Sequence, residues 1–218
     1  MRTGLLLGIF LLCAMHAALA ADPAVRKGEA LLAKVEAQTA GIKDFVADLK
    51  ARVNLPLLPG VGLSGHVYFK QPRKVRVQLD NLPRFVQGYK QQFSGLAPTR
   101  RNKTDYTARH IGQESVLGRP AEVVAVTAKD PKSNLRLITM WIDPKDFTVP
   151  RAALKYADQT VITTQTKYMR IEGFLLPASQ DMQFNLPHIA GTATAAYSNY
   201  KINQGLADAV FDKPQKGR

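Results

Sequence analysis

The sequence predicts a mainly β protein of the α+β class, built on one strongly curved antiparallel sheet with few helices. Three observations lead to this prediction. Segments in which apolar and polar residues alternate are separated by short stretches rich in turn residues, which is typical of antiparallel strands. Only one long segment shows clear helical spacing. Several predicted strands are apolar on both faces, which favours a sheet wrapped around an apolar interior.

The first 20 of the 218 residues have the features of a secretory signal peptide. Arg2 precedes an apolar stretch, and Ala18-Leu19-Ala20 is a typical cleavage site, so we expect cleavage after Ala20 and export. The alternative is a membrane anchor, which needs about 20 apolar residues, whereas the uncharged stretch covers only residues 4–20. Cys13 is the only cysteine, so the mature chain has neither a disulfide nor a thiol nucleophile.

The mature chain begins with one predicted helix. Asp22 is suited to an N-cap, Pro23 to the first helical position and Gly41 to the residue after the helix end. The apolar residues between them recur at helical spacing, which predicts an amphipathic helix of about five turns. From residue 45 to residue 53 the period changes to two, which predicts the first strand.

Residues 63–79 predict a hairpin with one apolar face and one basic face. Its arms, residues 63–70 and 74–79, flank Pro72, which fixes φ and cannot donate to a strand ladder. The apolar face carries Val67, Phe69, Val75, Val77 and Leu79. The other face carries Lys70, Lys74 and Arg76.

The remainder of the chain is predicted to be a meander of strands. Residues 81–103 show no sustained period, and we expect one short helix there, around 85–93. Strands are then predicted over residues 104–112, 121–128, 135–142, 147–156, 160–171, 182–186 and 192–202. With the three earlier strands this gives about ten. We expect a single domain over residues 21–204, followed by a short helix and a basic tail over 205–218.

The predicted strand over residues 135–142 is an example of a strand that is apolar on both faces. Leu135, Leu137 and Trp141 occupy one face, and the other face also carries aliphatic side chains. Such an interior is either a tightly filled core or a cavity that holds a ligand, and the residues alone leave both interpretations open.

The chain carries a large excess of positive charge. Its formal net charge is +13, and ten of its 30 lysine and arginine residues lie between His66 and His110, where Asp80 and Asp105 are the only acids. In an exported protein this charge points to anionic lipid head groups or acidic proteins as partners, and not to nucleic acid. The other interpretation is a solvated face that maintains solubility.

Motifs of enzymes are nearly absent. Residues 60–65 fit G-x-G-x-x-G, but they lead into a strand instead of opening a helix, which argues against a dinucleotide fingerprint. The mature chain has only His66, His110 and His188, none at metal-ligand spacing. We therefore expect no enzyme activity, no metal and no cofactor. Ser64 beside His66 keeps a lipid ester hydrolase as a minor alternative.

The hairpin resembles a known family. Residues 65–77, Gly-His-Val-Tyr-Phe-Lys-Gln-Pro-Arg-Lys-Val-Arg-Val, are similar to the G-x-hydrophobic-aromatic-x-K-x-P-x-x-x-R pattern of the outer-membrane lipoprotein-sorting proteins, called LolA-like and including LolA, LolB and RseB. Residues 117–120, 140–144 and 181–187 extend the likeness over most of the mature chain.

The resemblance implies a periplasmic carrier that shields acyl chains for transfer toward the outer membrane. Its fold would be an unclosed β-barrel with an apolar cavity, covered by the N-terminal helix and short helices. The expected lining is Val67, Phe69, Val75, Val77, Leu79, Leu137, Trp141, Tyr168, Phe184 and Leu186. The expected rim is Lys70, Gln71, Arg73, Lys74 and Arg76.

The same resemblance sets the expected partners. These are lipid or acylated lipoprotein cargo, partner proteins in the inner and outer membranes and an anionic membrane surface, with the protein itself a monomer. An envelope sensor or accessory binding subunit of the same fold is the main alternative.

Overall fold

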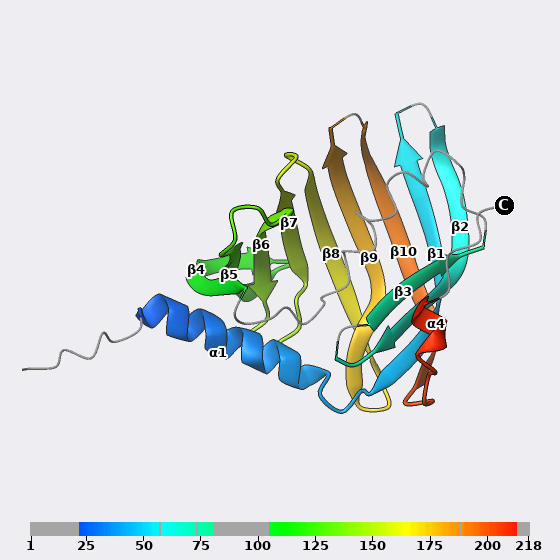
Figure 1. Cartoon of the computed structure of the whole chain (residues 1–218), viewed down its shortest axis with the longest axis horizontal. Coiled ribbons are helices and arrows are strands. Elements are labelled where there is room, and N and C mark those ends of the chain that lie inside the picture. The colour runs from blue at the N-terminus through cyan, green and yellow to red at the C-terminus, as the bar shows by residue number, and fades with distance from the viewer. Residues whose placement is uncertain (1–21, 57, 73, 81–104, 188, 213–218) are drawn as a thin grey trace, which may run out of the picture.

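The chain forms one antiparallel sheet with a long helix on its concave side (Figure 1). The computed structural model describes residues 22–56, 58–72, 74–80, 105–187 and 189–212. The helices are α1 (Pro23–Gln38) and α4 (Ala209–Asp212). The strands are β1 (Asp44–Leu55), β2 (Leu58–Lys70), β3 (Lys74–Leu79), β4 (Tyr106–Val116), β5 (Arg119–Ala128), β6 (Leu135–Ile142), β7 (Arg151–Tyr156), β8 (Val161–Ile171), β9 (Phe174–Leu186) and β10 (Ile189–Ile202).

The predicted fold class is confirmed, including the number of strands. The sheet has ten strands in the order β3-β2-β1-β10-β9-β8-β7-β6-β5-β4, and every neighbouring pair is antiparallel. Two meanders, β1–β3 and β4–β10, are therefore joined where β1 pairs with β10. Within the described residues the strands β3 and β4 are the two edges, and they do not pair to close the sheet into a barrel.

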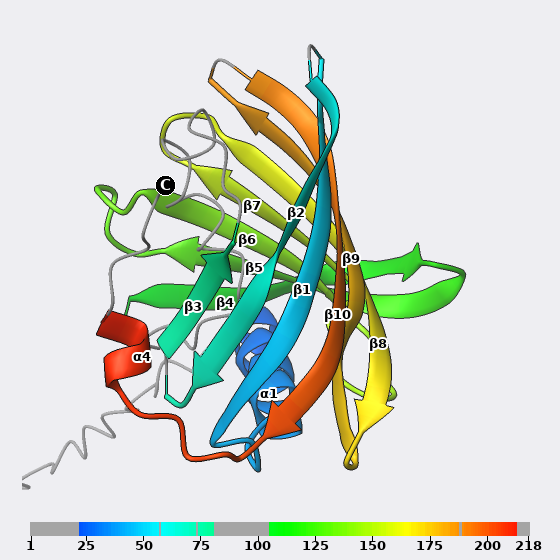
Figure 2. The ribbon, with the colours of Figure 1, turned by 90° about the vertical axis from the view of Figure 1, so that its right-hand side faces the viewer.

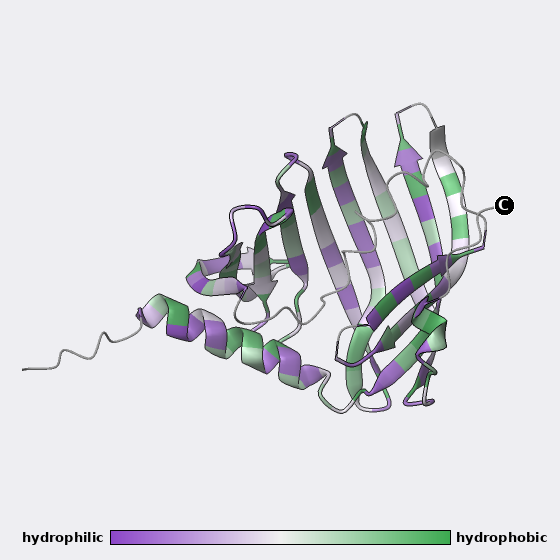
Figure 3. Cartoon of the chain, in the orientation of Figure 1, coloured by the Kyte–Doolittle hydropathy of each residue, from purple (hydrophilic) through white to green (hydrophobic). Residues whose placement is uncertain are grey.

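The sheet curls strongly, and the main core lies on its concave face. In Figure 2 the strands β3 to β5 stand across from β1 and β10, with α1 inside the curve. Figure 3 shows that polar and apolar bands alternate along most strands, so each of these strands has one apolar face. The buried members of the main core are Leu31, Val53, Leu55, Leu63, Ala108, Val124, Val126, Leu135, Ile138, Ile142, Leu154, Tyr156, Ile162, Phe184, Leu186 and Ala193.

The helix α1 begins as the sequence predicts. The Asp22 carboxylate accepts a hydrogen bond from the Ala24 backbone N–H (2.8 Å), and Pro23 occupies the first helical position. Gly28 and Leu31 are its buried residues, and the helix packs against β4 and β5. No helix among the described residues is long and apolar enough to cross a membrane.

Three strands start four or more residues away from their predicted positions. The strand β2 starts at Leu58 because Pro59 lies opposite an irregularity between Val53 and Leu55, where a missing N–H is tolerated. The strand β9 starts at Phe174, not at 182, because Pro177 is accommodated where the register shifts at Lys167/Tyr168.

The strand β7 starts at Arg151 instead of residue 147. Residues 143–148 form a turn in which the Asp143 carboxylate accepts from the Lys145 N–H (2.9 Å) and the Asp146 carboxylate from the Thr148 N–H (3.1 Å). The expected short helix around 85–93 and the tail beyond residue 212 lie outside the described residues.

Candidate functional site: the concave face of the sheet

The β2–β3 hairpin carries its predicted apolar residues on the concave side. Its register pairs Val67 with Val77 and Phe69 with Val75, while Leu79 lies opposite Gly65. Residues that pair directly across strands project to the same face of a sheet. All five predicted hairpin residues therefore share the face that also carries Leu63 of the main core.

The same face continues to the middle of the sheet. Val53 of β1 pairs with Ala193 of β10, which in turn pairs with Met182 of β9. Phe184 and Leu186 follow Met182 at intervals of two residues, and both belong to the main core. The predicted residues on β9 are therefore on the same apolar face as those of the hairpin, although Phe184 is only 3% exposed.

Tyr168 of β8 forms a hydrogen bond with the loop that precedes β7. Its hydroxyl donates a hydrogen bond to the Val149 carbonyl oxygen (3.1 Å). Burial raises the pKa of the Tyr168 hydroxyl to about 12, so the hydroxyl keeps its proton and remains a donor at neutral pH. This residue holds the segment before β7 against β8.

Two predicted lining residues lie on the opposite, outer face. Trp141 of β6 pairs with Val123 and packs in a separate cluster with Val116 and Ala121. Its indole N–H donates to Glu114 Oε2 (2.7 Å), and the Arg151 guanidinium stands 4.4 Å from the ring centroid. Leu137 has the same parity as Trp141, so the structure does not bring either residue to the predicted lining.

Other residues, not predicted from the sequence, take their place. On β6 the concave side carries Ile138 and Met140, which pair with Val126 and Val124 of β5. Several apolar side chains packed against the core remain partly exposed: Leu32, Val35, Ala51, Val61, Leu79, Tyr106, Met140, Phe147, Val149, Ala152, Met182 and Ile189. The described residues thus leave apolar surface accessible on the concave face and on α1.

One buried carboxylate marks the α1 end of this face. Glu122 of β5 accepts from Gln113 Nε2 (2.8 Å), pairs with Lys27 Nζ of α1 (3.0 Å) and contacts His110 Nε2. Burial alone would raise the pKa of Glu122, but the hydrogen bonds from Gln113, Lys27 and His110 outweigh it and lower the pKa. The carboxylate is therefore ionised and links the helix to the sheet.

The expected basic rim is engaged within the chain. Lys70, Lys74 and Arg76 project to the outer face of the hairpin, and all three bind the C-terminal segment around Asp208. Gln71 Nε2 donates to the Thr39 carbonyl oxygen (3.0 Å) and so joins the hairpin turn to the end of α1. Arg73 lies outside the described residues.

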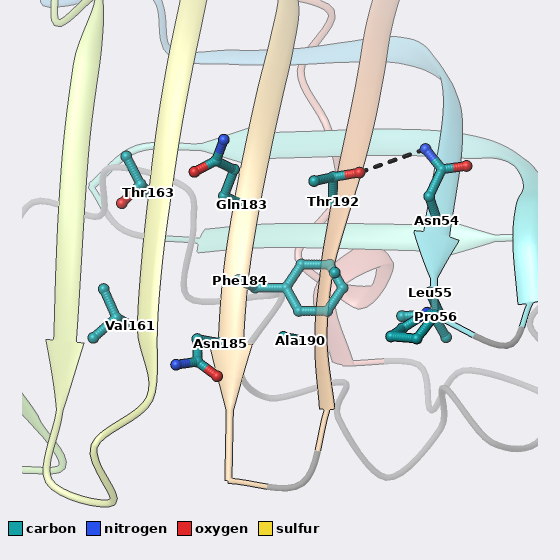
Figure 4. Close-up of a pocket in the computed structure, with 11 residues that line it drawn as sticks. Asn54, Leu55, Pro56, Val161, Thr163, Gln183, Phe184, Asn185, Ala190 and Thr192 are labelled. Carbon is teal, nitrogen blue, oxygen red and sulfur yellow. Dashed lines mark hydrogen bonds between the residues drawn. The ribbon is translucent and has the colours of Figure 1, made fainter.

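A depression of about 830 Å³ lies near the ends of β1, β8, β9 and β10. Figure 4 shows that polar side chains of the outer face, including Thr163, Gln183 and Thr192, form much of its lining. These three pair with one another across β8, β9 and β10. Leu55, Pro56, Val161 and Phe184 also line it, so its surface mixes polar groups with a larger apolar part.

The residues of the hydrolase alternative do not form a nucleophile–base pair. The Ser64 hydroxyl donates to Asp80 Oδ2 (3.3 Å), whereas His66 Nδ1 contacts Asp48 Oδ1 (3.1 Å). Among the described residues no hydrogen bond joins Ser64 to His66, and no group of three or more metal-ligating side chains is found.

Comparisons with known proteins bear on the fold. A family model described as that of an uncharacterized protein matches residues 70–215. Among similar solved structures, a Vibrio parahaemolyticus domain named for outer-membrane lipoprotein sorting has a TM-score of 0.69 and 12% identity, and the match covers 86% of this chain and 97% of that chain. A DUF1329 family protein from Desulfovibrio piger has a TM-score of 0.65 and 15% identity, with 86% and 97% coverage.

A LolA superfamily protein from Nitrosomonas europaea is similar to the same extent. Its TM-score is 0.65 and its identity 17%, and the match covers 85% of this chain and 97% of that chain. The search of curated proteins gave no match.

Proposed function

This chain belongs to the family whose model spans residues 70–215 and has the LolA-like fold, and from that premise we propose that it is a periplasmic carrier of lipids or lipoproteins. The carrier shields acyl chains on the concave face of its sheet and releases them toward the outer membrane. The signal-like residues 1–20 support export of the chain to the periplasm.

One observation carries the proposal: the concave face is mainly apolar from β3 across to β6 and is partly exposed. Val77, Met182 and Met140 lie on it in three separate parts of the sheet. Each CH₂ group of an acyl chain that leaves water for such a surface gains about 0.8 kcal/mol. A chain of ordinary length is therefore held without any charged or catalytic group.

The polar groups on this face support binding and not chemistry. Thr166 and Tyr197 are joined through Gln180, which donates to Thr166 Oγ1 (3.2 Å) and accepts from the Tyr197 hydroxyl (3.3 Å). Their hydrogen-bonding capacity is used within the protein, and Glu122 is used to attach α1. A bound acyl chain would meet satisfied polar groups at these positions.

Lipid analysis of the mature protein, purified from its own envelope and examined by native mass spectrometry, tests this proposal. We expect an acylated species bound in near-stoichiometric amount. Val77→Glu places a carboxylate on the concave face of β3 and should abolish this species. Gln78→Glu is the matched control, because it places the same group on the outer face of the same strand and should leave the bound species unchanged.

Two outcomes would contradict the proposal that acyl chains are carried on the concave face. One is a protein that is empty when purified and also fails to take up lipid or lipoprotein in vitro. The other is equal loading of the Val77→Glu and Gln78→Glu variants, which would place the bound molecule away from the concave face. Circular dichroism of both variants verifies that the sheet is retained.

A further inference from the structure

A second surface lies on the outer side of the β2–β3 hairpin, opposite the apolar face. It consists of the basic side chains of Lys70, Lys74 and Arg76, and residues 203–212 run across it. Lys70 Nζ contacts both Asp208 Oδ1 and the Leu206 carbonyl oxygen at 2.6 Å. These contacts place α4 beside β3 at the edge of the sheet, as Figure 2 shows.

The groups that bind these cations are those of a peptide. Lys74 Nζ contacts the second carboxylate oxygen of Asp208 at 2.9 Å. Arg76 Nη1 donates to the Val210 carbonyl oxygen at 2.7 Å. The cations therefore recognise one carboxylate placed between two main-chain carbonyl groups, at residues 206 and 210. A phosphate or a lipid head group supplies the negative charge but not the spaced carbonyl oxygens.

The contact between the C-terminal segment and the hairpin has features of a contact that opens easily. Asp208 is 60% exposed in its side chain, and α4 has no buried residue. Exposed ion pairs of this kind add little stability, so the segment can leave the surface at small cost. The part just before it is fixed, because the buried Asp44 carboxylate accepts from the N–H groups of Gln204, Gly205 and Leu206.

We propose that the basic outer face of the hairpin is a docking site for an acidic peptide segment of a partner protein. Residues 206–212 occupy this site as an internal substitute, and the partner displaces it from residue 207 onward, because Asp44 holds the Leu206 N–H. The site faces away from the concave surface, so the proposal does not depend on what the carrier holds. Charge complementarity at Lys70 and Lys74 and the carbonyl contact at Arg76 select the partner's segment.

The test measures binding of a fluorescently labelled peptide with the sequence of residues 205–212, Gly-Leu-Ala-Asp-Ala-Val-Phe-Asp, to the full mature chain. In the wild type the tethered segment competes at a high effective concentration, so binding should be weak. Asp208→Lys places a like charge against Lys70 and Lys74 and should release the segment. We expect the variant to bind the peptide about tenfold more tightly than the wild type does.

Matched controls separate site-specific binding from general charge attraction. Asp212→Lys makes the same change of charge on the same segment but leaves Asp208 in place, so its peptide affinity should remain at the wild-type level. A peptide with asparagine at the position of Asp208 should bind the Asp208→Lys variant several-fold more weakly. Adding Lys70→Gln and Lys74→Gln to that variant should remove the gain.

Three results would overturn the proposal. Hydrogen exchange over residues 207–212 that does not rise in Asp208→Lys would show that the ion pairs do not hold the segment. Increased exchange without tighter peptide binding would show that the exposed surface does not bind acidic peptides. A gain in binding to vesicles of phosphatidylcholine with phosphatidylglycerol, with no gain for the peptide, would assign the surface to membranes.

Discussion

Gly28 of α1 lies directly against the backbone of Ala108 in β4. A Cβ atom at position 28 would stand 2.8 Å from the Ala108 carbonyl oxygen. Glycine inside a helix is about 1 kcal/mol less favourable than alanine, yet here it lets the helix approach the strand without a side chain between them. The close docking of α1 on the edge of the sheet therefore requires the smallest residue.

Gly28→Ala should destabilise the protein although it improves helix propensity. The new methyl group must push α1 away from β4 or distort the strand, and such overpacking costs about 1–3 kcal/mol. The free energy of unfolding in urea measures the effect. Glu29→Ala, at the exposed neighbouring position, should stay within about 0.5 kcal/mol of the wild type. A Gly28→Ala variant as stable as the wild type would show that helix and strand separate freely.

The wild type should lose more stability in acid than Glu122→Gln does. The folded protein lowers the pKa of Glu122 below its ordinary value of 4.5. A lowered carboxyl pKa stabilises the folded state above the unfolded pKa, and the contribution is lost as the pH falls from about 4.5 through the folded value. Urea unfolding measured from neutral pH down to pH values below that window checks the difference. Parallel pH profiles would refute a role for this carboxylate in acid unfolding.

Leu117→Asn should stabilise the β4–β5 hairpin. Leu117 and Gly118 form its turn with φ values of 52° and 74°, and the leucine is 55% exposed. Asparagine tolerates positive φ and suits such turns, so we expect a gain of about 0.5–1 kcal/mol. Thermal unfolding measures it. Leu117→Ala is the control, because it removes the same exposed side chain without relieving the backbone, and an equal gain there would assign the effect to the lost apolar surface.

Asp44→Ala should loosen the end of β10 and the segment after it. The Asp44 carboxylate is 3% exposed and accepts three backbone N–H groups, at 2.8, 3.0 and 3.2 Å. Leaving these donors without a partner should cost about 2–3 kcal/mol. Hydrogen exchange should rise at residues 204–206, whereas Asp48→Ala, farther along β1 at a more exposed carboxylate, should leave it unchanged. Slow exchange retained in Asp44→Ala would show that other contacts fix this segment.

The sequence was sufficient to predict the apolar face of the hairpin but not the face of β6. In β2 and β3 each apolar residue alternates with a polar one, so the period of two assigns the faces. In β6 both faces are apolar, and periodicity cannot tell which one meets the concave core. Trp141 is buried on the outer face because the end of the β4–β5 hairpin covers it and Glu114 accepts from its indole.

The contact that the basic residues make within the chain could not be predicted from the sequence either. Lys70, Lys74 and Arg76 stand out as a basic face of the hairpin, which the structure confirms by placing them on the side opposite the apolar residues. Their contact with Asp208 joins residues far apart in the chain, and nothing in the local pattern around either group signals it. The sequence also gave no sign of the Glu122 cluster, because its members lie on α1, β4 and β5.

The pairing of β1 with β10 determines the order in which the sheet can assemble. Phe45 pairs with Ile202, so the two meanders can join only when the chain as far as residue 202 is available for pairing. Contacts between such distant residues are slow to form because a long loop must close first. Until then, the apolar side of β1 has no neighbour on its β10 edge. An exposed strand edge of this kind is prone to aggregation, so we expect a holdase chaperone to protect the intermediate until β10 arrives, without speeding the pairing itself.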